Sequence, residues 1–409
     1  MDRLRRAANS IIEASIRAVQ PDEAVRRALS GMEHPEGKLI IVAVGKAAWQ
    51  MAKAASEVAD YDAGIVVTKY GHVSAEIPGM VCYEAGHPVP DENGFRAADA
   101  VLELVSDLTE KDLVVFLLSG GGSALFERPL IPGEELQDIT RQLLASGADI
   151  TEMNVIRKRL SAVKGGRFAL ACRPAKVFSV VLSDVLGDPL DVIASGPAYE
   201  DASTCEEASE LVRRYRLKLS ERAKKLLAEE TPKALDNVTT EITGSVRELC
   251  RAAAAECEKL GYEVIYLTDR LSCEASEAGR FLGAIAASHA GSAGKRRKAF
   301  IAGGETVVHL RGTGLGGRNQ ELALAAAPFI EGLDAAVFSF GSDGTDGPTD
   351  AAGGYVDGDT MSRLKASGID IFAALADNDA YHALQASGGL IMTGPTGTNV
   401  NDVSIALIG

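Results

Sequence analysis

The sequence has 409 residues, which is longer than one hydrophobic core usually supports, so we expect two domains. Hydrophobic residues make up 46% of the chain and charged residues 24%, a composition typical of globular proteins. The formal net charge is −15. This charge disfavours binding to nucleic acid or to an anionic membrane surface, because the whole molecule repels polyanions.

The distribution of apolar residues, cysteines and histidines argues against a membrane-spanning, a secreted or a zinc-binding protein. No apolar run approaches the roughly 18 residues of a membrane span, and the N-terminal region lacks the compact apolar stretch of a signal peptide. The six cysteines show no C-x-x-C spacing and are expected to be reduced thiols. The six histidines form no H-x-x-x-H or H-E-x-x-H pair, so we expect no zinc site. We therefore expect a cytoplasmic protein.

Short apolar runs alternate with helical patterns along the chain, which predicts βαβ units and a largely parallel sheet. At the N-terminus, arginines alternate with an apolar stripe of helical spacing, which predicts a packing helix. Strands are then expected over 38–44, 64–68, 113–118, 176–182, 262–268, 299–302 and 335–340. Helices are expected over 47–58, 94–106, 150–172, 206–230 and 272–289.

The character of the chain changes beyond residue 201. A densely charged helical segment over 206–230 is followed by Pro232 and by a polar stretch at 237–244. After this interruption the alternation of strands and helices resumes. We therefore predict an N-terminal domain over 1–240 and a C-terminal α/β domain over 241–409.

Two glycine-containing loops follow predicted strands of the N-terminal domain. Gly45 and Lys46 lie between the strand 38–44 and the next helix, where backbone amides and a lysine charge favour an anion. Ser119, Gly120, Gly121, Gly122 and Ser123 follow the apolar strand 113–118. Without side chains, the glycine backbone can approach a phosphate or carboxylate closely. We interpret both loops as parts of a phosphate or substrate cradle.

A third loop, after the strand 176–182, carries Asp184 and Asp188. Two carboxylates in such a loop suit Mg²⁺, which binds few protein carboxylates and many waters. Either could instead accept the proton of an attacking hydroxyl. Aspartate is also an ordinary turn residue, so the structural alternative stays open for each.

In the C-terminal domain, Gly312, Gly314 and Gly317 match the G-x-G-x-x-G spacing of dinucleotide-binding loops, a motif that is weak when it occurs alone. Arg318 follows directly and opens an apolar helix, where a bidentate contact to phosphate or carboxylate is favoured. Asp343 lies in an acidic, glycine-rich loop that resembles a cation site but lacks the spacing of an EF-hand.

The predicted helix over 150–172 is basic, and its cations are Arg157, Lys158, Arg159, Lys164 and Arg167. A solvated face is the usual explanation for such a run. Against a net charge of −15, some of these side chains could line an anion site instead. No Walker A sequence and no protein-kinase signature occurs, so any ATP site must use another cradle.

These loops, in this order, resemble the glycerate 2-kinase family, whose C-terminal part is called the MOFRL domain. Each stretch alone is unspecific, whereas their combination covers nearly the whole chain and is highly specific. No motif position departs from the family pattern. The matching stretches are residues 44–48, 86–91, 118–123, 154–166, 182–197, 303–321, 341–354 and 394–402.

The resemblance implies ATP-dependent phosphorylation of D-glycerate with Mg²⁺, commonly giving 2-phosphoglycerate. It implies a Rossmann-like N-terminal parallel sheet, a second α/β domain and an active site in the cleft between them. We expect a monomer or homodimer. The family's catalytic lysine and arginine fall on Lys46 and Arg318, which we expect to converge on the transferred phosphoryl group. Asp184 is our candidate for the base, although the resemblance does not settle which aspartate serves. Expected substrate or nucleotide contacts are Gly45, Ser119, Gly120, Gly121, Gly122, Ser123, Asn154, Lys164, Gly316, Gly317 and Asn319, and expected metal ligands are Asp184, Asp188 and Asp343.

Two alternatives remain at this point. An NAD(P)-dependent hydroxypyruvate reductase would use the G-x-G-x-x-G stretch, and Asp343 lies near the distance expected for a ribose-binding acid. Arg318 fits a pyrophosphate turn less well than a small residue would. A non-catalytic small-molecule binding protein is also compatible with two domains.

Overall fold

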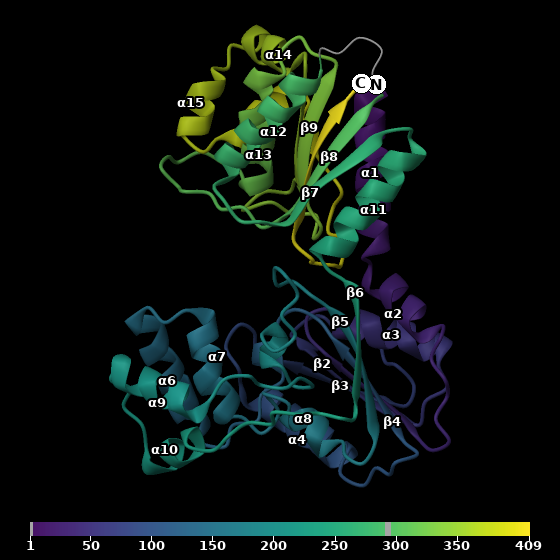
Figure 1. Cartoon of the computed structure of the whole chain (residues 1–409), viewed down its shortest axis with the longest axis vertical. Coiled ribbons are helices and arrows are strands. Elements are labelled where there is room, and N and C mark those ends of the chain that lie inside the picture. The colour runs from purple at the N-terminus through teal and green to yellow at the C-terminus, as the bar shows by residue number, and fades with distance from the viewer. Residues whose placement is uncertain (1–2, 291–295) are drawn as a thin grey trace. The chain divides into compact units, whose positions relative to one another are not determined.

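The computed structural model describes residues 3–290 and 296–409, which form two compact units. The N-terminal unit comprises residues 24–183 and 188–243. The C-terminal unit comprises residues up to 23, residues 184–187 and residues from 244 on. Each unit contains one six-stranded sheet with helices packed around it (Figure 1). The expected α/β class with two sheets is confirmed.

The sheet of the N-terminal unit has the strand order β3-β2-β1-β4-β5-β6. The first five of these strands are mutually parallel, and β1 lies between β2 and β4. Strands β1 and β4 are apolar and almost entirely buried, as expected for central strands covered on both faces. The bounds are β1 (Leu39–Val44), β2 (Ala63–Lys69), β3 (Met80–Ala85), β4 (Leu113–Leu118), β5 (Lys176–Leu182) and β6 (Val238–Gly244).

Helices cover both faces of this sheet. On one face, α2 and α3 share a core with alternate residues of β1 and β4, such as Ile41 and Val115. Phe116 points to the opposite face, where its ring packs against Phe126 and Phe168. The helices of this part are α2 (Pro21–Leu29), α3 (Ala48–Val58), α4 (Glu92–Leu104), α5 (Gly122–Leu125) and α8 (Arg167–Ala171), with a 3-10 turn η1 (Ile193–Ser195).

Four further helices of the N-terminal unit form a small cluster with its own apolar core, visible together in Figure 1. Leu143, Ile156 and Leu211 are among the residues that fill this core. Helix α7 begins at a capping box, in which Asp149 and Glu152 satisfy the free backbone amides. The bounds are α6 (Gly133–Ser146), α7 (Ile150–Arg159), α9 (Cys205–Arg214) and α10 (Glu221–Leu227).

The sheet of the C-terminal unit has the order β11-β10-β9-β12-β8-β7 and is mixed. The last strand, β12, lies between β8 and β9 and is antiparallel to both, whereas β7 and β8 are parallel. The expected largely parallel arrangement therefore does not extend to this unit, because the chain returns through its centre in the opposite direction. The bounds are β7 (Glu263–Leu271), β8 (Lys298–Gly304), β9 (Ala335–Gly341), β10 (Gly353–Asp357), β11 (Leu390–Ile391) and β12 (Asp402–Ile408).

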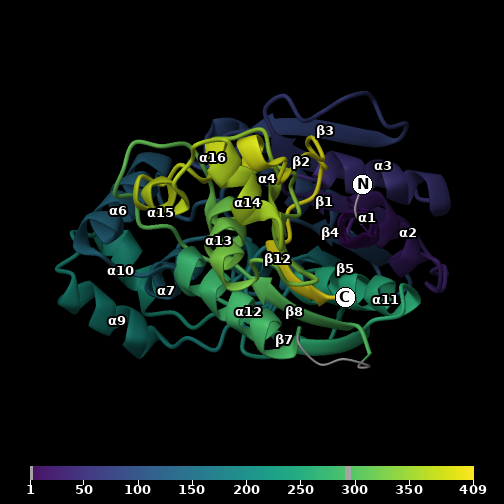
Figure 2. The same cartoon turned by 90° about the horizontal axis from the view of Figure 1, so that it is seen from above.

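Two helices, α1 and α11, pack on one face of this sheet, and α12, α13 and α16 pack on the other (Figures 1 and 2). The helices of this unit are α1 (Arg3–Ala18), α11 (Val246–Lys259), α12 (Ala275–His289), α13 (Arg318–Ala326), α14 (Thr360–Ala366), α15 (Ile371–Ala376) and α16 (Ala380–Ser387), with a 3-10 turn η2 (Ala327–Phe329).

The structure divides the chain differently from the single boundary near residue 240. The second unit does begin close to that point, at Gly244, but it also contains α1 and residues 184–187. The apolar stripe of α1 explains this placement, because Ile11 and Ile12 are buried in the same core as Leu249 and Phe338. Covering one face of the sheet thus requires the N-terminal helix.

The long basic helix expected over 150–172 is two helices, α7 and α8. They are separated by Gly165 and Gly166, whose φ angles of 56° and 82° are incompatible with a continuous helix. The charged segment 206–230 is likewise divided, into α9 and α10. Among the residues that the structure describes, no helix has the length and apolar character needed to cross a bilayer.

The packing of α1 generates a prediction about stability. Ile11→Ala removes a fully buried side chain from the core of the C-terminal unit, so we expect a loss of about 2–5 kcal/mol in the free energy of unfolding. The exposed Ile150 provides a matched control, and Ile150→Ala should change this free energy by less than about 0.5 kcal/mol. Equal effects in urea denaturation would contradict the placement of α1.

Candidate functional site

In the N-terminal unit, the strand order reverses between β1 and β4. The chain leaves β1 towards β2 on one side, and later returns to β4 on the other side. In such sheets the loops after the two strands diverge and leave room for a ligand at their carboxyl ends. The loops at this position are residues 45–47 after β1 and residues 119–123 after β4. These are the two loops that the sequence singled out.

The two loops are bonded directly to each other. The backbone N–H of Lys46 donates to the carbonyl oxygen of Gly120 over 2.9 Å, and the N–H of Ala47 donates to Ser119 Oγ over 3.1 Å. A side chain at Gly45 would overlap Ser119, and Gly45 has a φ of 123°. Ser119 is buried, so its hydroxyl supports the loop from behind, and no ligand contact is needed to explain it.

The glycine loop, residues 119–123, presents a row of backbone N–H groups. Gly121 has a φ of 87°, a conformation that glycine adopts without strain, and the short helix α5 begins at the next residue. Within the described residues, the N–H groups of Gly120, Gly121, Gly122 and Ser123 form no hydrogen bond to another backbone group. Successive free amides of this kind form a concavity that binds anions.

Two basic side chains lie beside this loop. Both Lys46 and His87 approach Gly121 so closely that a Cβ there would come within 3.2 Å of Lys46 Cγ and 3.1 Å of the His87 ring. Partial burial and the neighbouring charge of Lys46 lower the pKa of His87. His87 is therefore neutral at pH 7, whereas Lys46 is exposed and forms no ion pair with a carboxylate of the described residues.

A strained turn supports the glycine loop from the other side. Ala194, Ser195 and Gly196 all have positive φ angles, of 51°, 62° and 64°. The Ser195 hydroxyl donates to Asn154 Oδ1 over 2.9 Å and lies 3.2 Å from Ser123 Oγ. The structure thus joins two predicted site residues, Ser123 and Asn154, through a residue that the sequence analysis did not select.

Lys164 lies behind the loop and not on its open surface. Its ammonium group is fully buried, 2.8 Å from Glu127 Oε2 and 2.9 Å from the carbonyl oxygen of Phe126. Burial lowers the pKa of Lys164 to about 8, although the Glu127 carboxylate opposes this change. These contacts favour a structural role, because the ion pair anchors the chain directly after α5.

The two aspartates expected to share a metal belong to different units. Asp184 lies in the segment 184–187 of the C-terminal unit, where its carbonyl oxygen accepts a hydrogen bond from Asn401. Asp188 belongs to the N-terminal unit and has a φ of 53°. One carboxylate oxygen of Asp188, Oδ1, is buried without a hydrogen-bond partner. Such an oxygen fits a cation ligand.

In the C-terminal unit, Arg318 is held by two carboxylates. Its guanidinium forms a bidentate pair with Asp402, with N–O distances of 2.6 and 3.1 Å, and a further bond of 2.7 Å to Glu305. Burial raises the pKa of Asp402 to about 6, while the ion pair with Arg318 limits this rise. Three of the five N–H donors of Arg318 are used by these bonds, which fix its orientation.

The G-x-G-x-x-G stretch has a structural explanation in this fold. Side chains at Gly312 or Gly314 would overlap the turn containing Asp377, and one at Gly317 would overlap Asp346. The N–H groups of Asn319 and Gln320, at the start of α13, already donate to the Asp346 carboxylate over 3.1 and 2.8 Å. The helix end expected to hold a phosphate is thus occupied by a side chain of the protein.

Three other predicted site residues of this unit also contact neighbouring residues of the protein. The amide of Asn319 is buried between Asp346 and Ser339. Gly316 packs against the residues around Ala380. Asp343 is partly exposed and accepts a bond of 3.0 Å from the N–H of Thr345. Of these three residues, Asp343 is the one with carboxylate surface available.

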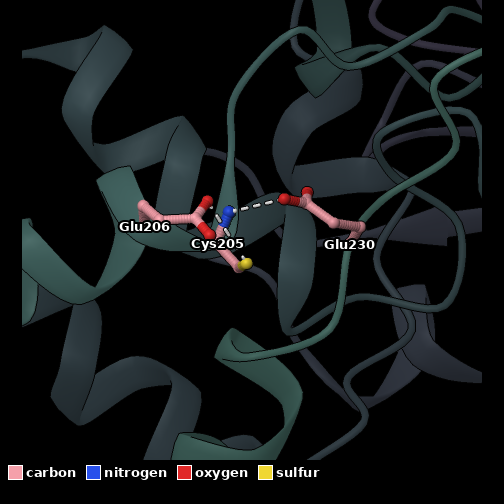
Figure 3. Close-up of side chains that lie close together, drawn as sticks. All are labelled: Cys205, Glu206 and Glu230. Carbon is pink, nitrogen blue, oxygen red and sulfur yellow. Dashed lines mark hydrogen bonds between the residues drawn. The ribbon is translucent and has the colours of Figure 1, made fainter.

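Among the described residues, one group of three potential metal ligands lies together: Cys205, Glu206 and Glu230 (Figure 3). Glu230 already accepts the N–H of Cys205 and pairs with Lys233, and these contacts lower the pKa of Glu230 to about 2. The protein itself thus supplies partners for this carboxylate at the start of α9. The arrangement indicates a helix-end contact and not a metal site.

The buried Lys164–Glu127 pair yields a prediction for a double-mutant cycle. Lys164→Met or Glu127→Gln alone should lower the free energy of unfolding by about 3–5 kcal/mol, because each leaves an uncompensated buried group. The double variant should recover much of this loss. Guanidinium denaturation measures all four proteins. Additive losses would mean that the two side chains do not interact in the folded protein.

Comparison with known proteins places the chain among relatives of similar length. Residues 7–228 match a domain of unknown function, DUF4147, and residues 298–402 match the MOFRL family. A D-glycerate 2-kinase of Thermotoga maritima is 52% identical over 99% of this chain and 98% of its own. A glycerate 2-kinase of Pyrococcus horikoshii is 41% identical over 97% of this chain and 96% of its own.

The fold agrees with these relatives. The crystal structure of the glycerate kinase of Thermotoga maritima matches with a TM-score of 0.94 over 99% of both chains, at 52% identity. A solved structure from Pyrococcus horikoshii also has a TM-score of 0.94, at 39% identity, over 100% of this chain and 99% of its own. The chain therefore belongs to the glycerate kinase family that carries the MOFRL domain.

Proposed function

We propose that the protein transfers the γ-phosphoryl group of ATP to D-glycerate and releases 2-phosphoglycerate. The observation that carries this proposal is the glycine loop at the switch point between β1 and β4, with its four free amides beside the exposed Lys46. Relatives that match the whole chain are named D-glycerate 2-kinase and glycerate 2-kinase, which supports the choice of reaction and acceptor.

Phosphoryl transfer depends mainly on positioning and on neutralising charge on the transferred oxygens. The amides of residues 120–123 and the ammonium of Lys46 would bind phosphate oxygens of the nucleotide, since the amides have no backbone partner and Lys46 lies beside Gly121. Their frame is rigid, because the N–H groups of Gly45 and Ser119 donate to Val67 and Val44 in two buried strands, and Gly120 accepts a bond from Lys46. Such a frame needs no reorganisation during the reaction.

Arg318 is proposed as the second cation of the same reaction. Its bonds to Asp402 and Glu305 fix the guanidinium, and the two N–H groups that they leave could donate to a phosphate oxygen. A guanidinium held in this way keeps its full charge and its orientation. We propose Asp184 as the base that accepts the proton of the attacking hydroxyl.

The residues present also fit a magnesium ion. Mg²⁺ binds one or two protein carboxylates and otherwise waters and phosphate oxygens. Asp188 offers a buried oxygen without a partner, and Asp343 offers a partly exposed carboxylate. These two residues are the proposed ligands, and Asp184, the proposed base, is the remaining candidate among the three aspartates. When bound, the ion would supply positive charge that neutralises part of the charge of the phosphate groups.

The oxidoreductase alternative loses its main support. A dinucleotide would need the amides at the start of α13, and these are bonded to Asp346. A relative from Agrobacterium vitis, 40% identical over 99% of this chain and 94% of its own, is provisionally named a hydroxypyruvate reductase. Oxidation of NADH by hydroxypyruvate at an enzymatic rate would therefore favour that alternative over ours.

We further propose a cytoplasmic protein that acts as a monomer or homodimer. The six cysteines form no disulfide, and those at 172, 250 and 257 are buried thiols, as expected for a reducing compartment.

The position of the phosphate can be tested by supplying the product to enolase without a mutase. We expect a signal from enolase that matches the ADP formed, because enolase requires the 2-phosphate. ADP without an enolase signal would indicate a different hydroxyl or acceptor. Absence of ADP in the presence of glycerate would reject the proposed reaction.

The two cations generate a kinetic prediction. Lys46→Ala and Arg318→Ala should each lower kcat on the order of 10²–10³-fold, as expected for preorganised charge donors. Arg318→Ala leaves Asp402 buried without its partner, so the Arg318→Ala/Asp402→Asn variant is needed to separate catalysis from stability. Lys53→Ala, on the exposed face of α3, is the control and should retain activity. Unchanged kcat in the variants of both cations would reject these assignments.

A further inference from the structure

We infer that Ser123 and Arg157 form the subsite for the acceptor, in which Arg157 binds the carboxylate of the hydroxy acid and Ser123 Oγ accepts a hydrogen bond from one of its hydroxyl groups. This inference rests on the proposed function and names the residues that would select a small dihydroxy acid. Both residues belong to the N-terminal unit, and Arg157 Nη2 donates to the carbonyl oxygen of Ser123 over 3.0 Å.

Arg157 differs from the other cations of its segment. Lys158 is buried against Asp201 and Asp191, Arg159 is buried against Glu230, and Lys164 is buried against Glu127. Arg167 donates to three backbone carbonyls. In the described part of the chain, no carboxylate forms an ion pair with Arg157, and its side chain is partly exposed.

An arginine of this kind has a charge that the fold does not neutralise. Its bond to the Ser123 carbonyl orients the guanidinium at the glycine loop and leaves further N–H donors. A planar guanidinium matches a carboxylate through two parallel bonds. In a chain of net charge −15, a guanidinium without an ion-pair partner beside the proposed phosphate loop is therefore suited to an anionic substrate.

The neighbours of the Ser123 hydroxyl determine whether it donates or accepts hydrogen bonds. Ser195 donates its hydroxyl hydrogen to Asn154 Oδ1, so Ser195 Oγ has only lone pairs left for Ser123. The hydrogen bond between the two serines, 3.2 Å long, must then be donated by Ser123. Ser123 Oγ consequently presents lone pairs elsewhere, which repel phosphate or carboxylate oxygens and accept a hydrogen bond from a hydroxyl group.

The surrounding turn explains why this arrangement is fixed. Left-handed backbone at Ala194 and Ser195 is costly for residues with a side chain and persists only where several contacts impose it. Here the carbonyl oxygens of Ser195 and Gly196 accept bonds from Gly165 and Gly166, and Ala194 packs against Gly122. The strain thus brings the Ser195 hydroxyl to the glycine loop, as expected at a functional site.

The guanidinium and the hydroxyl are close together, because Arg157 bonds the backbone carbonyl of the same residue that carries the Ser123 hydroxyl. A ligand that uses both must carry a carboxylate and a hydroxyl a few bonds apart. Glycerate has this chemistry, whereas glycerol lacks the carboxylate and acetate lacks the hydroxyl. The subsite therefore selects the acceptor and not the nucleotide.

The role of Arg157 can be tested by steady-state kinetics. Arg157→Gln should raise the KM for D-glycerate roughly 10²-fold, because a charged hydrogen bond to the substrate is lost, and should leave the KM for ATP unchanged. Arg157→Lys should recover part of this loss through its charge. The control is Arg141→Gln on the exposed surface of α6. Equal increases in both KM values, or none, would overturn the assignment of Arg157.

The role of Ser123 can be tested with two analogues as competitors of D-glycerate: lactate, which lacks the C3 hydroxyl, and 3-hydroxypropionate, which lacks the C2 hydroxyl. Ser123→Ala should weaken glycerate and one analogue roughly 10-fold, and should leave the other unchanged because it lacks the contacting hydroxyl. Ser106→Ala on the surface is the control. Identical effects on all three ligands, or no effect, would overturn the assignment of Ser123.

The hydrogen-bond chain from Ser123 through Ser195 to Asn154 is tested at its far end. Asn154→Asp keeps an acceptor for Ser195. This variant should therefore retain the wild-type preference for glycerate over the analogue whose binding Ser123→Ala leaves unchanged. Asn154→Leu should lower this preference, as Ser123→Ala does. If Asn154→Leu does not fold, Ser195→Ala replaces it, since alanine already occupies the left-handed position 194. If a folded variant without the hydrogen-bond chain keeps the wild-type preference for glycerate, the proposed role of the chain is wrong.

These outcomes separate the subsite from the reaction. A wild-type protein that forms no ADP with glycerate would reject the proposed function. A wild-type protein that does form ADP, with variants of Arg157 and Ser123 that keep their glycerate KM, would reject only the subsite.

Discussion

The parallel pairing of β1 with both β2 and β4 is the constraint on which the site depends. It places the carboxyl ends of two buried strands next to each other, and the loops that follow them, residues 45–47 and 119–123, are hydrogen-bonded to each other there. Ser119 and Gly45 are in contact at this point, and among the described residues the N–H groups of residues 120–123 form no hydrogen bond to another backbone group. The proposed chemistry follows from this geometry.

Some of the basic residues near this loop form ion pairs with carboxylates, and others do not. Lys158, Arg159 and Lys164 belong to buried ion pairs that hold the helices and loops of the N-terminal unit together. Lys46 and Arg157 have no ion-pair partner among the described residues and lie beside the glycine loop. An acidic protein thus keeps two cations without ion-pair partners beside the loop where an anionic substrate would bind.

The sequence predicted the parts of the site that depend on local patterns. An apolar strand followed by glycines identifies a loop at a strand end, so Lys46 and the loop 119–123 were found together. The burial and the hydrogen-bond partners of a side chain depend on residues that are distant in the sequence. For this reason Lys164 and Asn319 are predicted as ligand contacts, although both are buried in contacts within the protein. The sequence indicates no role for Ser195, because only the folded chain brings it to Ser123. It includes Arg157 among the basic residues that could line an anion site, but it cannot tell which of them lacks an ion-pair partner. The same limit applies to the fold, since the antiparallel β12 and the placement of α1 depend on contacts between segments that are distant in the sequence.

The central claim is that the glycine loop binds the phosphates of the nucleotide. Amide NMR spectra of the ¹⁵N-glycine-labelled protein, recorded with and without a non-hydrolysable ATP analogue and Mg²⁺, test it most directly. We predict large shifts at Gly120, Gly121 and Gly122, with Gly312 and Gly314 unaffected. Shifts at Gly312 and Gly314 without any at the loop 120–122 would contradict the account.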